Sequence, residues 1–79
     1  MKSEFEFTLL LTGITDFTDE HVDALFAAGC DDATVARRLG RVYVTFCRSA
    51  ETPLQAIASA IDDVERAGIG ALVLRVDRG

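Results

Sequence analysis

The hydrophobic residues of this 79-residue chain change their spacing along the sequence, from the period of a strand to that of a helix and back. Residues 4–12 alternate between apolar and mostly polar side chains, which predicts a strand with one buried face. From Thr18 to Gly29 the apolar residues recur at helical spacing. Thr18 is a plausible N-cap, and Gly29 is a plausible helix stop. The first third of the chain therefore predicts a strand followed by a helix.

The rest of the chain continues this order. Residues 33–38 and 41–48 have strand patterns on either side of a turn, so they predict a hairpin. The segment Thr52–Gln55 fits a capping box and begins a helix that Gly68 ends. Residues 71–76 are apolar enough for a final strand. The buried stripe of the second helix is predicted to consist of Leu54, Ile57, Ala58, Ile61 and Val64.

The order strand, helix, strand, strand, helix, strand limits the fold to few arrangements. Two right-handed crossovers around a central hairpin give a four-stranded antiparallel sheet with both helices on one face. We therefore predict an α/β fold of the α+β kind, a ferredoxin-like βαββαβ two-layer sandwich with the strand order 4-1-3-2. A chain of 79 residues has the size of one domain, so we expect a single domain over residues 1–79.

Charge is divided unevenly along the chain, whose formal net charge is −5. Residues 1–36 carry eight acids against Lys2 alone, whereas residues 37–79 carry seven arginines against five acids. An acidic chain is a poor ligand for nucleic acid, because phosphate neutralisation by Lys and Arg supplies most of that affinity. We expect a basic protein surface as the partner and no direct contact with nucleic acid.

The composition disfavours several classes of protein. No apolar run approaches the ~18 residues of a membrane span, and acids interrupt the N-terminal apolar residues, unlike in a signal peptide. Cys30 and Cys47 have neither the spacing of a zinc site nor the number of a disulfide scaffold. We expect reduced, mostly buried thiols, no metal or other cofactor, no membrane partner and a cytoplasmic location.

No set of residues forms a catalytic motif, so we expect that the protein is not an enzyme. His21 is the only histidine, and no motif places a nucleophile or an acid beside it. Asp62 and Asp63 are neighbours on a helix and point apart, so they cannot act as a facing carboxylate pair. A metabolite-sensing domain that binds at the Gly13 loop stays possible, although no ligand signature supports it.

Acidic residues gather on one face of the first predicted helix. Their spacing of i, i+3, i+4 and i+7 places them opposite the apolar stripe, and two further acids follow the helix. A solubilising helix face is the plainer interpretation. The functional interpretation is a contact surface for a basic protein patch, since such surfaces raise association rates and select partners. The candidate protein-binding residues are Asp16, Asp19, Glu20, Asp23, Asp31 and Asp32.

The sheet face that the helices leave open is a second candidate surface. RNA binding there is disfavoured, because Tyr43 is its single aromatic residue and Glu4 and Glu6 would repel phosphate. Since the face is partly apolar, it could join two copies of the chain in a homodimer; the alternative is a tolerated mixed surface. The candidate dimer face consists of Leu10, Tyr43 and Val73.

Three segments resemble the N-terminal ferredoxin-like domain of small bacterial helix-turn-helix DNA-binding regulators. They are EFEFTLLLTG, DALFAAGCDDATV and GRVYVTFCRSAETPLQAIASAIDDVERAG, and the resemblance covers roughly residues 4–68. In those regulators a helix-turn-helix usually follows the fourth strand, but this chain ends at Gly79. The resemblance therefore implies the fold, and an oligomerisation or regulatory domain derived from such a regulator, without DNA binding.

In size and charge the chain is also similar to the phage and mobile-element inhibitors called anti-CRISPR proteins, which occupy nucleic-acid or partner sites on Cas proteins. This likeness is an analogy, because those proteins share no common motif. The leading hypothesis is a non-enzymatic inhibitor in the cytoplasm of a bacterial host. It would bind a basic patch on a Cas or other nucleic-acid-handling protein, imitate the charges of a nucleic-acid backbone and block the substrate. The alternative is the regulatory domain.

Overall fold

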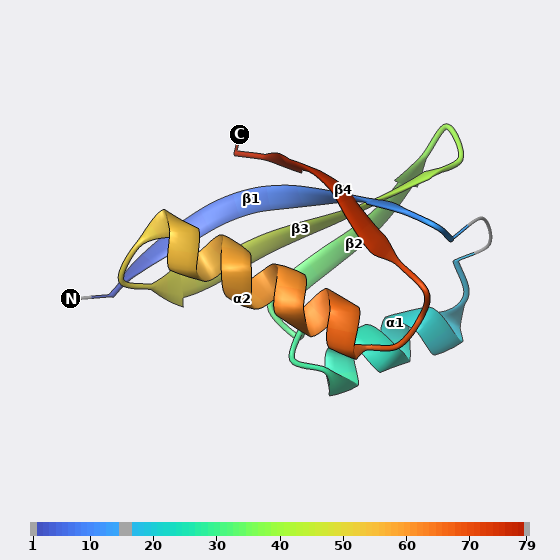
Figure 1. Cartoon of the computed structure of the whole chain (residues 1–79), viewed down its shortest axis with the longest axis horizontal. Helices are drawn as coiled ribbons and strands as arrows, with labels where there is room; N and C mark the ends of the chain where they lie inside the picture. The colour runs from blue at the N-terminus through green and yellow to red at the C-terminus, as the bar shows by residue number, and fades with distance from the viewer. Residues whose placement is uncertain (1, 15–16, 79) are drawn as a thin grey trace.

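The computed structural model describes residues 2–14 and 17–78. Its elements are β1 (Ser3–Thr12), α1 (Asp19–Ala27), β2 (Ala33–Arg38), β3 (Arg41–Ala50), α2 (Pro53–Arg66) and β4 (Leu72–Asp77). The strands form one antiparallel sheet in the order β2-β3-β1-β4, and the two helices pack against it (Figure 1). The predicted ferredoxin-like fold and strand order are therefore confirmed.

The core lies between the helices and one face of the sheet. The two central strands, β1 and β3, pair in a register in which Phe7 is opposite Phe46 and Leu9 is opposite Val44. The rings of Phe7 and Phe46 stack with their centroids 5.5 Å apart. Leu25 is the wholly buried residue that α1 adds to this cluster. Alternation along β1 thus directs one set of side chains into the core, as predicted.

Helix α2 begins as the sequence predicts but is rotated relative to the predicted stripe. The side chain of Thr52 accepts a hydrogen bond from the backbone N–H of Gln55 at 3.1 Å, which caps the helix. Leu54 is 76% exposed, so its predicted burial is wrong, and Ala58 is exposed as well. Small side chains face the sheet instead and allow the helix to pack closely. The buried residues of α2 are Ala56, Ala60 and Val64.

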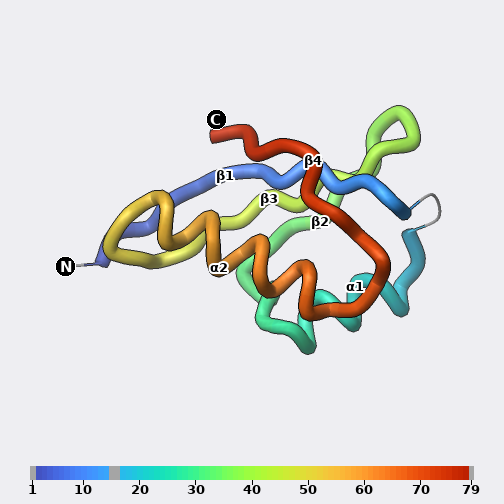
Figure 2. Tube along the Cα trace, viewed as in Figure 1, coloured from blue at the N-terminus to red at the C-terminus, as the bar shows by residue number. Residues whose placement is uncertain are grey.

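The turn between β2 and β3 projects beyond the body of the molecule, as the chain trace in Figure 2 shows. Leu39 and Gly40 form this turn, with φ values of 53° and 76°. Two successive residues with positive φ are typical of the two-residue hairpin turn whose twist matches that of the strands. The predicted hairpin is confirmed, and Leu39 occupies a conformation that glycine or asparagine adopts at lower cost.

Candidate functional site

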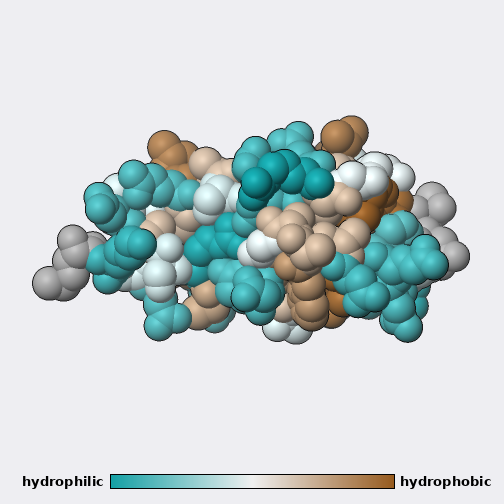
Figure 3. All heavy atoms as spheres, turned by 90° about the horizontal axis from the view of Figure 1, so that it is seen from below, coloured by the Kyte–Doolittle hydropathy of each residue, from teal (hydrophilic) through white to brown (hydrophobic). Residues whose placement is uncertain are grey.

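The exposed side of α1 carries a group of carboxylates that we call the acidic face, formed by Asp19, Glu20 and Asp23. All three residues are exposed, and none forms an ion pair with a basic residue that the structure describes. In Figure 3, which is seen from below the view of Figure 1, hydrophilic side chains gather in the region of α1. Asp31 is also exposed. Asp16 lies outside the described residues.

The start of α1 is held by a hydrogen bond between its N-cap residue and the side chain of His21. The backbone N–H of Thr18, the N-cap residue, donates to Nδ1 of His21 at 3.0 Å. This is the place where a capping box usually has Glu or Gln. The ring of His21 also packs against Phe17, with the ring centroids 5.4 Å apart. His21 thus has structural contacts at the start of the acidic face, which a search for Glu or Gln at this position does not detect.

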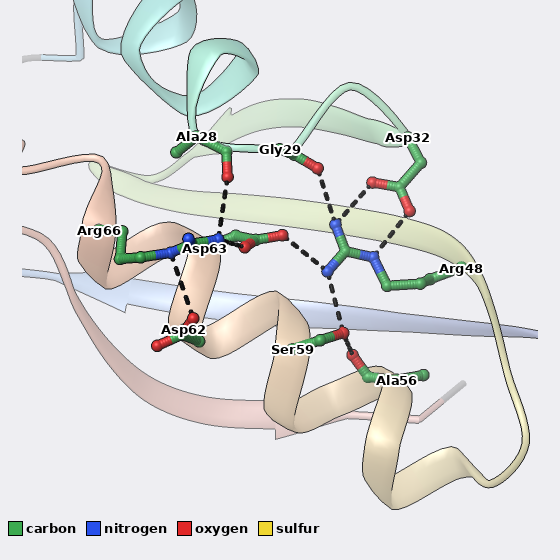
Figure 4. Close-up of polar contacts among 9 residues, drawn as sticks. All are labelled: Ala28, Gly29, Asp32, Arg48, Ala56, Ser59, Asp62, Asp63 and Arg66. Atoms are coloured by element: carbon green, nitrogen blue, oxygen red, sulfur yellow. Dashed lines mark hydrogen bonds and ion pairs between the residues drawn. The ribbon is translucent and has the colours of Figure 1, made fainter.

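Arg48, near the end of β3, forms a network that the sequence analysis missed (Figure 4). Its guanidinium donates to both carboxylate oxygens of Asp32, at 2.8 and 2.9 Å. It also donates to Asp63 at 2.9 Å, to the hydroxyl of Ser59 at 3.1 Å and to the carbonyl of Gly29 at 3.0 Å. These bonds use the full donor capacity of a guanidinium. Arg48 therefore joins β3 to α2 and to the loop after α1.

This network includes Asp32, one of the candidate protein-binding residues. Hydrogen bonding from Arg48 is the main cause that holds the pKa of Asp32 below its ordinary value, and the same bond raises the pKa of Arg48. The side chains of Arg48 and Asp63 are only 11% and 13% exposed. Both carboxylate oxygens of Asp32 thus bind an internal arginine, and its role in protein binding stays a prediction. Asp31, its exposed neighbour, stays a candidate.

Asp63 connects this network to a second arginine. Arg66, on the last turn of α2, contacts Asp63 and also pairs with Asp62 at 3.2 Å. Its guanidinium lies 3.4 Å from the carbonyl of Ala28 at the end of α1, to which it donates. The positive charges of Arg48 and Arg66 are thus balanced by neighbouring carboxylates, so neither is placed to neutralise the acidic face.

Three other arginines gather at the β2–β3 turn, and we call Arg37, Arg38 and Arg41 the basic hairpin. All three are exposed, and none has an ion-pair partner within residues 2–14 and 17–78. Leu39 stands at the tip with its side chain fully exposed. A hollow of about 310 Å³ is lined by Arg37, Arg38, Leu39, Gly40 and Val42. The molecule therefore presents acids on α1 and unneutralised arginines on a hairpin.

Two of the three residues of the predicted dimer face lie on the open side of the sheet, and Val73 does not. Leu10 does point to the open side of the sheet, but it is only 1% exposed because Tyr43 and Arg75 lie opposite it on both neighbouring strands. Val73 lies on the other side of the sheet. The register shifts so that Leu10 pairs with Arg75 and Leu11 with Val73, which turns Val73 towards the core. Tyr43 is on the open face and half-buried.

The two cysteines differ in environment. Cys30 is fully buried, and burial is the main cause that raises its pKa to about 11. Cys47 is exposed, against the expectation of mostly buried thiols, and its thiol donates to a carboxylate oxygen of Glu4 at 3.2 Å. That hydrogen bond raises the pKa of Cys47. Within the described part of the chain, no three metal-ligating side chains gather in one place.

Comparisons with known proteins found no match. No model of a protein family, no curated protein and no solved structure matches this chain. Among the described residues, no helix has the length and apolar character needed to cross a membrane.

Proposed function

We propose that this chain is a non-enzymatic protein-binding module whose acidic face, together with Asp31, binds a basic patch on a nucleic-acid-handling protein. The observation that carries the proposal is the exposure of Asp19, Glu20 and Asp23 on one side of α1 with no basic partner among the described residues. Exposed carboxylates contribute little to the stability of a fold. Their charge is available to a partner.

The distribution of charge supports a role in association. Arg48 and Arg66 are bound by Asp32, Asp62 and Asp63, so the acidic face is not cancelled from within the network. A concentrated patch of one sign attracts a complementary surface, accelerates encounter and disfavours partners of like charge. We expect binding to weaken as salt is added, because the Debye length falls from ~10 Å at 0.1 M to ~3 Å at 1 M.

The most specific form of this proposal is an inhibitor of the anti-CRISPR type, encoded by a phage or mobile element and acting in the cytoplasm of a bacterial host. Its carboxylates would take the place of nucleic-acid phosphates on a basic patch of a Cas subunit. The small size, the net charge of −5 and the exposed acidic face support this form. The alternative is a regulatory domain derived from a DNA-binding regulator, which the ferredoxin-like fold also suits.

A competition assay tests the inhibitor directly. Purified CRISPR effector complexes are incubated with labelled target DNA, and DNA binding is measured with and without the chain. We expect the natural chain to reduce DNA binding by at least one of these complexes, and the Asp19→Asn/Glu20→Gln/Asp23→Asn variant to have no effect.

The matched control removes three acids elsewhere. The Glu51→Gln/Asp62→Asn/Glu65→Gln variant changes three exposed acids and the net charge by the same amount, and it should inhibit like the natural chain. Inhibition that survives loss of the acidic face would contradict the proposed surface. If the natural chain leaves DNA binding by every tested effector unchanged, the anti-CRISPR form of the proposal is wrong.

A further inference from the structure

The open face of the sheet has a row of threonines across its middle. Thr34 on β2 pairs with Thr45 on β3, which pairs with Thr8 on β1. The hydroxyls of Thr8 and Thr45 are hydrogen-bonded at 3.0 Å. We call these three residues the threonine row. Residues two or four positions from them on each strand share this face, because side chains alternate along a strand.

Charges of opposite sign lie at the two ends of this face. Glu4 and Glu6 precede Thr8 on β1, and both are exposed. Arg41 precedes Thr45 on β3, but β3 runs antiparallel to β1, so Arg41 lies beyond the other side of the threonine row. Arg38 on β2 is directly opposite Arg41, and both are exposed. The open face thus has an acidic end and a basic end.

The two ends are equally far from the threonine row. Glu4 is four residues before Thr8, and Arg41 is four residues before Thr45. At about 3.3 Å per residue, each charge lies roughly 13 Å from the row. If a second copy were turned end for end about an axis over Thr8 and Thr45, its basic end would therefore lie against the acidic end of the first copy, and its acidic end against the basic end.

We propose that the open face binds a second copy of this chain and forms a symmetric homodimer. The two-fold axis would lie between the sheets, perpendicular to the strands and over the threonine row. A two-fold interface brings the same patch of both copies together, so each contact occurs twice. Glu4 of each copy then faces the end that carries Arg38 and Arg41 of the other. An axis parallel to the strands would instead oppose like charges, which selects the first orientation.

A second contact follows from the same geometry. Glu6 is two residues before Thr8 and Leu10 is two residues after it, so the axis brings Glu6 of one copy over Leu10 of the other, beside Tyr43, which pairs with Leu10. The Tyr43 hydroxyl has no hydrogen bond to another side chain within the described residues, and it can donate to a carboxylate. Packed sheets lie ≈10 Å apart, a gap that these long side chains span from both sides.

This dimer is independent of the acidic face. Helix α1 packs against the opposite side of the sheet, so a dimer through the open face leaves both acidic faces exposed. If the proposed protein-binding function holds, the dimer presents two such faces and can gain affinity by binding twice. If the chain binds no such protein, the dimer can still be tested by itself.

The test uses two charge-reversal variants, studied by sedimentation with reductant present because Cys47 is exposed. One is Glu4→Arg/Glu6→Arg, which makes both ends of the face basic. The other is Arg38→Glu/Arg41→Glu, which makes both ends acidic. We expect a dimer for the natural chain, a monomer for each variant alone and a heterodimer for their equimolar mixture. The control Glu51→Arg/Glu65→Arg, which lies off this face, should stay dimeric.

Three results would overturn the proposal. They are a natural chain that is monomeric at every concentration reached, variants that dimerise like the natural chain, and a mixture that stays monomeric although both variants are folded by circular dichroism. If a charge-reversal variant does not fold, the milder Glu4→Gln/Arg41→Gln variant is measured in its place. The proposal then requires a dimer weaker than that of the natural chain, and an unchanged dimer contradicts it.

Discussion

Arg48 and Asp32 are joined by two parallel hydrogen bonds, from Nε and Nη2 of the guanidinium to the two carboxylate oxygens. Such two-pronged contacts fix orientation as well as distance. Arg48 also lies over the ring of Phe46, with its guanidinium carbon 5.0 Å from the ring centroid. The loop between α1 and β2 is thereby fastened to the central strand β3, which positions the end of α1 relative to the sheet.

The first prediction concerns the stability that this network provides. The Arg48→Met variant should lower the free energy of unfolding by about 2–4 kcal/mol, because Asp32 and the largely buried Asp63 lose their shared cation. Urea unfolding measures the change. The control is Arg75→Met, whose partner Asp77 and own side chain are about half exposed, and it should cost less than about 1 kcal/mol. If the two variants lost the same free energy of unfolding, the Arg48 network would not be a major source of stability.

The second prediction is a pH dependence. The Arg48 hydrogen bonds hold the pKa of Asp32 below 3.8, its value without such a partner. A carboxyl whose folded pKa is depressed stabilises the fold above the unfolded pKa, and this contribution is lost as the pH falls through the folded pKa. The free energy of unfolding should therefore decrease as the pH is lowered below 3.8. In the Asp32→Asn variant, urea unfolding should show a smaller decrease. An identical pH profile would contradict this assignment.

The third prediction compares two glycines with positive φ. A Cβ at Gly13 would lie 2.7 Å from the carbonyl oxygen of Gly70, whereas a Cβ at Gly68 would meet nothing within 4 Å. Both substitutions by alanine carry the cost of the left-handed backbone, ~1–2 kcal/mol. Gly13→Ala should cost clearly more than Gly68→Ala in thermal unfolding, because a backbone atom cannot move aside easily. Equal melting temperatures would mean that Gly70 is not held against Gly13.

The fourth prediction is a stabilising change at the hairpin tip. Leu39 has a φ of 53° and gains no packing, since its side chain is fully exposed. Asparagine tolerates this conformation better and is favoured before glycine in such turns. Leu39→Asn should raise the free energy of unfolding by about 0.5–1 kcal/mol, seen as a higher melting temperature. A lower melting temperature would indicate that Leu39 has a contact which this structure does not contain.

Local patterns predicted the elements well, because each strand and helix signal lies within a few consecutive residues. The alternation in residues 4–12 and the cap at Thr52 both correspond to observed elements. The orientation of residues on β4 was not predictable in this way. An extra residue at Leu74 reverses the alternation, so Val73 faces the core. Such a bulge depends on how β4 pairs with β1, which the β4 sequence alone does not encode.

The candidate site was predicted less well, because ion pairs join residues that are far apart in sequence. The sequence places Asp32 next to another acid, whereas the structure pairs it with Arg48, which is 16 residues away in the chain. A signal for Arg48 did exist. Arg48 is two residues after Phe46 and four after Val44, which are both buried, so its side chain points to the same, helix-covered side of the sheet. A charged residue on that side needs a partner. The sequence could therefore indicate that a partner is needed, but not which aspartates supply it.

The most direct measurement of the protein-binding proposal is a pull-down from bacterial lysates that express CRISPR effector complexes. The baits are the natural chain, the Asp19→Asn/Glu20→Gln/Asp23→Asn variant and the Glu51→Gln/Asp62→Asn/Glu65→Gln control. We expect the natural chain and the control to retain a Cas subunit and the variant without the acidic face to lose it. Retention of the same subunit by all three baits, or of no subunit by the natural chain, would contradict the account.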